Sequence, residues 1–178
     1  MSVLEADDPK RTSISGHFRI WKDVYDSLEE EARIHEISLN TFVNQLLAAY
    51  TRDELVYEKL GVLKLPKDTY RMMLELIPED KLSGFGRELI KHWPTALMLA
   101  RKGAITTDAV LSHLRDTSKM GFLSMYETEK NGRKVVSLTH EFGQRYSIIL
   151  TSAARGLFDL VNIRPEITTT DSSVTIEY

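Results

Sequence analysis

The sequence contains no cysteine among its 178 residues, which excludes disulfide bonds, thiolate metal ligands and thiol-based catalysis in this chain. It also lacks a long hydrophobic run. No stretch approaches the ~18 apolar residues of a membrane span, and the start, MSVLEADDPKR, has no apolar core of signal-peptide length. A strong charge of either sign is missing too, since 23 basic and 26 acidic residues give a net charge of −3. We therefore expect a cytoplasmic protein with no membrane partner.

What the sequence does contain is typical of a globular protein, with 42% hydrophobic and 28% charged residues. Its length allows one domain or two small ones. Residues 1–10 are acidic, contain a proline and show no periodicity, so we expect a disordered tail there. Because the whole chain carries little net charge, any contact with nucleic acid has to depend on local charge.

The stretch SISGHFRIW, residues 13–21, alternates as a β-strand does. One side carries Ile14, Gly16, Phe18 and Ile20, and the other carries Ser13, Ser15, His17 and Arg19. An amphipathic helix is predicted to follow directly, in WKDVYDSLEEEARIHE. A second helix is predicted from Ser38, a favourable N-cap residue, and its broad apolar face continues towards Gly61.

One strand and two helices of this size cannot bury the apolar surface that they carry. We therefore expect a twofold dimer in which the strands of two chains pair antiparallel and the helices pack behind them. Charge is segregated along the same segment. Between residues 10 and 52, four of the six basic residues precede residue 23, and all six acidic residues follow residue 22. The strand face is thus predicted to be cationic although the segment is neutral overall.

This order of elements resembles the ribbon-helix-helix repressors of the Arc and methionine-repressor class over residues 11–51. The residues that carry the likeness are ISGHFRI, KDVYDSLEEEA, the turn EIS and the helix start SLNTFVNQLL. Two departures are Glu36, where many members have glycine, and the inward-facing Gly16. The resemblance implies a DNA-binding domain at residues 11–52, an intertwined dimer whose two-stranded ribbon enters the major groove of double-stranded DNA.

The resemblance also implies which residues contact DNA. Base contacts are expected from Ser15, His17 and Arg19, since arginine can donate two hydrogen bonds to guanine. The amides and positive dipole end at the start of the second helix favour a phosphate. Phosphate contacts are therefore expected from Lys10, Arg11, Lys22, Ser38, Asn40 and Thr41.

Residues 53–61 are predicted to form a helical linker, and residues 62–178 a mixed domain of helices and antiparallel hairpins. The expected fold class of the chain is thus α+β. A short strand is predicted in VLKLP, residues 62–66, and the clearest hairpin turns at Asn131-Gly132, the pair that a type I′ turn favours. Helices are predicted over residues 67–77, 79–92, 95–102, 107–119 and 142–161, and a second hairpin over EITTTDSSVTIEY.

The junction LTHEFGQRYSIIL, residues 138–150, brings His140 and Ser147 near a predicted strand-to-helix turn. Such a junction can form a ligand pocket or an acid–base site. It is also typical of a capped helix with a hydrogen-bonded histidine, which we favour. Nickel-responsive repressors join a ribbon-helix-helix to a small metal-binding domain, but their site needs several histidines and a cysteine. We therefore predict no metal site and no cofactor.

Catalytic motifs are missing from the sequence: it has no G-x-S-x-G, and GFGREL, residues 84–89, lacks the GK[ST] ending of a phosphate loop. The first hypothesis is therefore a sequence-specific DNA-binding transcriptional regulator that acts as a repressor. We expect no enzyme activity. Its C-terminal domain would oligomerise or sense an unidentified small-molecule effector. The alternatives are an antitoxin or other protein-interaction module, and an enzyme or small-molecule sensor centred on His140.

Overall fold

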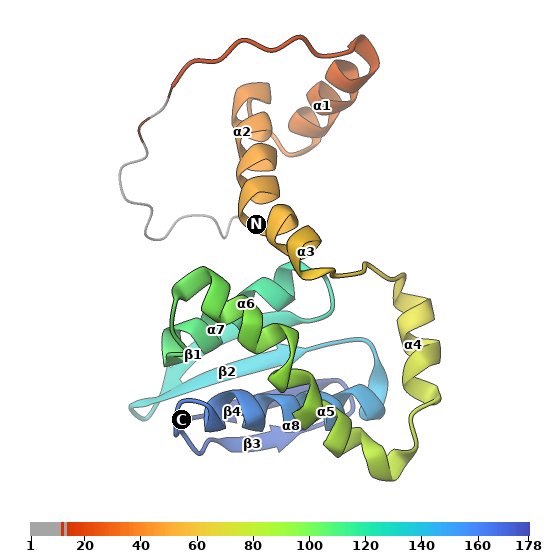
Figure 1. Cartoon of the computed structure of the whole chain (residues 1–178), viewed down its shortest axis with the longest axis vertical. Helices are drawn as coiled ribbons and strands as arrows, with labels where there is room; N and C mark the ends of the chain where they lie inside the picture. The colour runs from red at the N-terminus through yellow and green to blue at the C-terminus, as the bar shows by residue number, and fades with distance from the viewer. Residues whose placement is uncertain (1–11, 13) are drawn as a thin grey trace. The chain divides into compact units, whose positions relative to one another are not determined.

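The computed structural model describes residue 12 and residues 14–178 and confirms the α+β class, with helices and one four-stranded antiparallel sheet (Figure 1). The chain divides into two compact units, and the boundary in the sequence falls between Leu55 and Val56. We call residues up to Leu55 unit 1 and Val56–Tyr178 unit 2. The predicted tail, residues 1–10, lies outside the described residues.

Unit 1 contains α1 (Lys22–Ile34) and α2 (Leu39–Ala49), followed by a π-helical segment, η1 (Tyr50–Glu54). Both α-helices match the prediction. Ser38 is the N-cap of α2, and its hydroxyl accepts a hydrogen bond from the amide of Thr41 at 3.1 Å. The π-helical segment was not predicted, and α3 (Leu55–Leu60) follows it directly.

Glu36 lies in the turn between α1 and α2. Glu36 has a φ of 54°, in the left-handed region. The amide of Glu36 donates to the carbonyl of Arg33 at 3.1 Å, and that of Ile37 donates to Ala32 at 3.0 Å. These two bonds form a Schellman motif, in which glycine is the usual residue at the left-handed position. The backbone therefore adopts the conformation that glycine favours, with glutamate in its place.

Unit 2 has six further α-helical or 3₁₀ elements and the sheet. The helices are α4 (Lys67–Glu75), η2 (Glu79–Lys81), α5 (Leu82–Lys91), α6 (Trp93–Lys102), α7 (Thr107–Lys119) and α8 (Gly143–Asp159). The strands are β1 (Ser124–Lys130), β2 (Arg133–Thr139), β3 (Glu166–Thr169) and β4 (Ser173–Glu177), in the order β1-β2-β4-β3.

Both predicted hairpins form. The first turns at Asn131 and Gly132, whose φ values are 53° and 76°, as a type I′ turn requires. The second joins β3 to β4. The short strand predicted over residues 62–66 was wrong, because this stretch has no neighbouring strand to pair with and forms irregular chain before Pro66.

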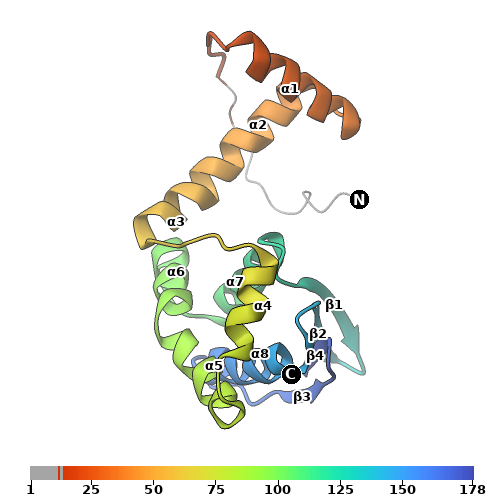
Figure 2. The same ribbon diagram turned by 90° about the vertical axis from the view of Figure 1, so that its right-hand side faces the viewer.

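The core of unit 2 lies between the helices and one face of the sheet. Seen edge-on in Figure 2, the helices lie on one side of the sheet and no described element covers the other. Strands β2 and β4 direct Val136, Leu138, Val174 and Ile176 into this core, where all four are fully buried. Helix α8 contacts β3 and β4, and α7 contacts β1. Helix α5 packs along α8.

Candidate functional site

Residues 14–21, which we predict to pair as a ribbon, are exposed and without regular secondary structure in the single chain. The apolar side chains of this segment face solvent, with Ile14 92% and Phe18 80% exposed. The proposed base contacts Ser15, His17 and Arg19 are exposed too. A strand needs a second strand to complete its hydrogen bonds. The ribbon therefore stays a prediction about two chains.

The predicted phosphate contacts on α2 lie together in its first turn. The Ser38 and Thr41 hydroxyl oxygens are 2.8 Å apart, and the Asn40 carbonyl accepts from the Asn44 side chain at 2.8 Å. The amides at the start of an α-helix have no carbonyl acceptor within the helix. The Ser38 hydroxyl accepts from the amide of Thr41, which leaves the amides of Leu39 and Asn40 without an intrahelical acceptor. This turn has the donors and the dipole orientation that suit a phosphate.

The other predicted phosphate contacts are partly described. Lys22 is the first residue of α1, and its ammonium lies 2.6 Å from the carboxylate of Asp26. This pair is exposed, so it contributes little free energy and leaves the lysine able to exchange partners. Lys10 and Arg11 lie outside the described residues.

His140 and Ser147 are hydrogen-bonded to each other in unit 2. Nε2 of His140 lies 2.8 Å from the Ser147 hydroxyl, and Nδ1 accepts from the amide of Phe142 at 3.3 Å. An amide can only donate, so Nδ1 carries no proton and Nε2–H is the donor to Ser147. Burial lowers the pKa of His140, which agrees with the neutral ring. Such a histidine cannot take the proton of Ser147, and Ser147 itself is fully buried.

A cleft of about 400 Å³ adjoins His140 at the end of the sheet where β1 begins and β2 ends. Its polar lining comes mainly from hydroxyl groups and one ion pair, in which the Lys67 ammonium lies 3.4 Å from Glu141. The hydroxyl groups belong to Ser118, Ser124, Thr139 and Ser172. Of the two residues predicted for a ligand pocket, His140 lines the cleft, whereas Ser147 lies behind it, hydrogen-bonded to His140 and fully buried.

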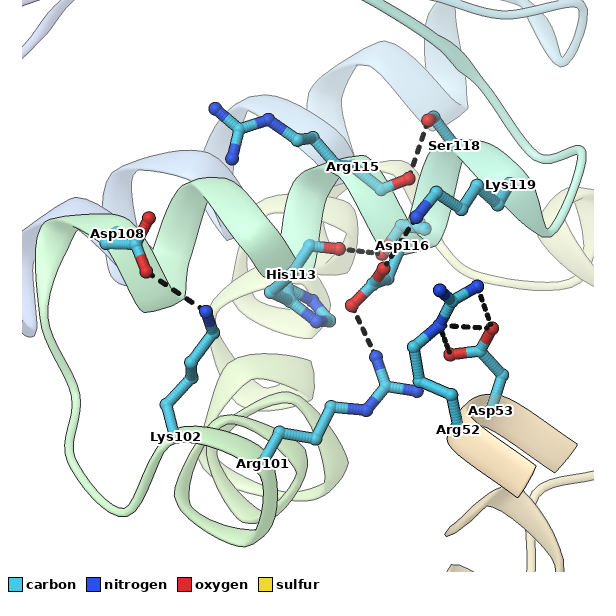
Figure 3. A network of polar contacts seen from close by, with 11 residues as sticks. Arg52, Asp53, Arg101, Lys102, Asp108, His113, Arg115, Asp116, Ser118 and Lys119 are labelled. Atoms are coloured by element: carbon cyan, nitrogen blue, oxygen red, sulfur yellow. Dashed lines mark hydrogen bonds and ion pairs between the residues drawn. The ribbon is translucent and has the colours of Figure 1, made fainter. Parts of the chain in front are cut away.

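A partly buried ion pair between α6 and α7 was not predicted. Arg101 and Asp116 form an ion pair with side chains 16% and 14% exposed (Figure 3). The guanidinium also lies 5.5 Å from the centre of the Tyr57 ring. His113 lies one turn before Asp116 and packs edge-on against Trp93 at 5.4 Å. Burial lowers the pKa of His113 to about 4, a shift that the charge of Asp116 opposes and that of Arg101 reinforces.

Within the described part of the chain, no group of three histidine or acidic residues is placed to hold a metal ion. In the same residues, no helix has both the length and the apolar character needed to cross a membrane. Comparison with known proteins gives no match, whether to protein-family models, to curated proteins or to solved structures.

Proposed function

We propose that this protein is a sequence-specific DNA-binding regulator that acts as a dimer through a ribbon-helix-helix unit 1. The observation that carries the proposal is that unit 1 lacks a core of its own. Among its described residues only Ala32 is buried, although the segment is rich in large apolar side chains. Burying apolar surface is the main favourable contribution to folding, so a segment of this composition needs a partner.

A second copy of the same segment is the partner that fits. Pairing of two ribbons would satisfy the free backbone groups of residues 14–21, and it would bury Ile14 and Phe18 against both copies of α2. Three large side chains of α2 and the residue after it are exposed in the single chain, and a second copy would cover them: Leu46, Leu47 and Tyr50. The Schellman turn at Glu36, which lets α1 and α2 follow each other closely, agrees with the same arrangement.

The charges of unit 1 support DNA as the ligand of the ribbon's outer face. Arg19 and Lys22 precede the acidic stretch of α1, whose acidic side chains are mostly exposed. In a dimer the basic residues of both chains would gather at the ribbon, and the acidic helices would stay away from the phosphates. The first turn of α2 would add amide donors on each side.

The compact unit 2 favours the regulator over an antitoxin. Antitoxins of this class usually carry a short disordered toxin-binding tail, whereas residues of unit 2 form a continuous hydrophobic core. Unit 2 would then oligomerise the regulator or bind an effector, and the hydroxyl-lined cleft beside His140 has the volume that a small polar effector needs.

Selection from a random library of double-stranded DNA, followed by gel-shift titration at fixed salt, tests the proposal. We expect a short near-palindromic site, and we expect Arg19→Ala and His17→Ala each to weaken binding at least tenfold. Arg164→Ala, which removes an exposed arginine of unit 2, is the matched control and should leave binding unchanged. Equal affinity of the parent, Arg19→Ala and His17→Ala would show that the ribbon does not contact bases.

A further inference from the structure

Three hydroxyl groups of the cleft beside His140 lie next to one another at one end of the sheet. Ser124 and Thr139 are opposite each other on β1 and β2, and the carbonyl of Ser172 accepts from the amide of His140 at 2.9 Å. All three serine and threonine residues line the cleft. Within the described residues their hydroxyls have no hydrogen-bond partner, so each can donate to and accept from a bound molecule.

The apolar part of the lining is held in place by packing. Leu123 and Phe142 are only 5% and 6% exposed, and Phe122 is half-buried beside them. The ring of Tyr70 packs edge-on against Phe122 at 5.4 Å and against Phe142 at 5.3 Å. His140 is fixed as well, because both of its ring nitrogens are hydrogen-bonded. This part of the cleft is therefore pre-formed, as small-molecule sites usually are.

One ion pair supplies the charge of the cleft. Lys67 begins α4, and Glu141 lies between β2 and α8. Their side chains are 53% and 73% exposed, and the ammonium and carboxylate are 3.4 Å apart. An exposed pair of this kind contributes less than about 1 kcal/mol, so a ligand can replace either partner at little cost. The other described residues of the lining carry no charge, since His140 is neutral.

This pairing of charges selects the class of ligand. An anion would gain from Lys67 but would be repelled by Glu141, and a cation would meet the opposite difficulty. A neutral molecule would gain nothing from either charge. A molecule that carries a carboxylate and an ammonium on the same carbon can contact both side chains at once, because its own charges are as close together as theirs.

We propose that the cleft beside His140 binds a free α-amino acid with an uncharged side chain. The carboxylate lies at Lys67, the ammonium lies at Glu141, and the hydroxyl groups complete their hydrogen bonds. The side chain of the ligand packs towards the exposed part of Phe122. The cleft's volume of about 400 Å³ falls in the range of small-molecule sites, about 300–1,000 Å³. Binding itself is independent of unit 1, whereas an effector role for the amino acid rests on the proposed function.

A thermal-unfolding screen of the common L-amino acids against the full-length protein, followed by calorimetric titration, tests the proposal. A ligand that binds only the folded state raises the midpoint of unfolding. We expect at least one amino acid with an uncharged side chain to do so, and glucose, a neutral hydroxylated molecule, to have no effect. Binding of glucose alone, of charged amino acids alone, or of none of these compounds would overturn the proposal.

Derivatives of the amino acid that binds best test the two ionic contacts. Its amide lacks the carboxylate and its N-acetyl derivative lacks the ammonium, so each should bind the parent about tenfold more weakly. Lys67→Gln should weaken the amino acid by a similar factor and leave its amide unaffected. Glu141→Gln should weaken the amino acid and leave its N-acetyl derivative unaffected. Losses that are equal for all ligands, or no loss, would contradict the assigned contacts.

Another exposed ion pair of unit 2 supplies matched controls. Lys91 and Glu88 of α5 are 67% and 56% exposed and lie 2.8 Å apart, outside the cleft. Lys91→Gln and Glu88→Gln remove the same charges from the chain, so they should leave the affinity for the amino acid unchanged. A loss as large as that of the cleft variants would show that the amino acid does not bind in the cleft.

Gel-shift titration with and without the amino acid separates this inference from the proposed function. Amino-acid binding by a protein that binds no DNA would contradict the proposed function and leave the cleft site supported. DNA binding by a protein that binds no amino acid would contradict the cleft site alone. An amino acid that binds without changing the affinity for DNA would support the site and contradict its role as an effector.

Discussion

Gly86 of α5 lies so close to Ile149 of α8 that a β-carbon on Gly86 would be 2.3 Å from the Ile149 carbonyl oxygen. Carbon and oxygen atoms that are not bonded do not approach to this distance. The neighbouring residues confirm the close crossing, because the hydroxyls of Ser83 and Ser152 are 2.7 Å apart. Glycine is therefore required at this position by packing, since the obstructing atom belongs to a backbone.

Gly86→Ala should destabilise the protein. The methyl group would push α5 away from α8, and overpacking of this kind lowers the free energy of unfolding by about 1–3 kcal/mol. Gly84→Ala is a control on the same helix, where nothing lies within 4 Å of an added β-carbon. That variant should raise the free energy of unfolding by about 0.5–1 kcal/mol, because alanine is the better helix former. Urea denaturation of the two variants and the parent measures both effects.

The packing role of Gly86 could not be predicted from the sequence. GFGREL resembles a phosphate loop only weakly, because it lacks the GK[ST] ending. The true reason for Gly86 is a contact with Ile149, 63 positions later, which no local pattern encodes. By contrast, Asn131-Gly132 specifies its own turn through local backbone preferences, and the hairpin could be predicted from these two residues with their flanking strands.

The candidate sites differ in the same way. Ser38 could be predicted as an N-cap because a cap depends on the next three residues. The ion pair of Arg101 and Asp116 joins two helices, and its burial depends on how these pack, so the sequence contains no sign of it.

Stability should fall as the pH drops from about 6.5 towards 4, because His113 is buried in its neutral form. Its pKa is about 4 in the folded chain and near 6.5 when unfolded, so the unfolded state binds more protons in this interval. The loss approaches about 3 kcal/mol across the interval. Asp116 favours the protonated ring and Arg101 opposes it, while desolvation is the largest effect. Urea denaturation at several pH values measures the slope.

His113→Leu should reduce this pH dependence and leave a smaller slope from His140, whose pKa is also lowered. Within the described residues Nδ1 of His113 has no hydrogen-bond partner, so its replacement breaks no bond at that atom. We expect the variant to match the parent at pH 7 within about 1 kcal/mol. His92→Gln, which changes an exposed histidine, should retain the parent slope. An unchanged slope in His113→Leu would contradict the assignment.

Glu36→Gly should stabilise the α1–α2 turn. Glu36 has a φ of 54°, and a residue with a β-carbon pays about 1 kcal/mol or more in the left-handed region. Glycine avoids this cost, so we expect slower hydrogen exchange of the α1 and α2 amides in the variant. Asn162→Gly is the control in unit 2: Asn162 follows α8 with a φ of 57°, and asparagine tolerates this conformation better than glutamate. A smaller gain is expected there, and equal gains would contradict the explanation.

Lys22→Gln should weaken binding to every DNA sequence by a similar factor, because a lysine beside phosphates contributes charge without sequence information. Each chain of the dimer would lose one phosphate contact, so the slope of log K against log salt should become less negative by about 2. The matched control is Lys91→Gln in α5, because Lys91 is an exposed helical lysine paired with Glu88 at 2.8 Å, as Lys22 is with Asp26. The control should leave the slope unchanged. Gel-shift titrations from about 50 to 200 mM salt, a range over which such contacts dominate affinity, measure both slopes. If Lys22→Gln and the parent gave parallel lines, Lys22 would lie outside the phosphate interface, and the ribbon would need another source of positive charge.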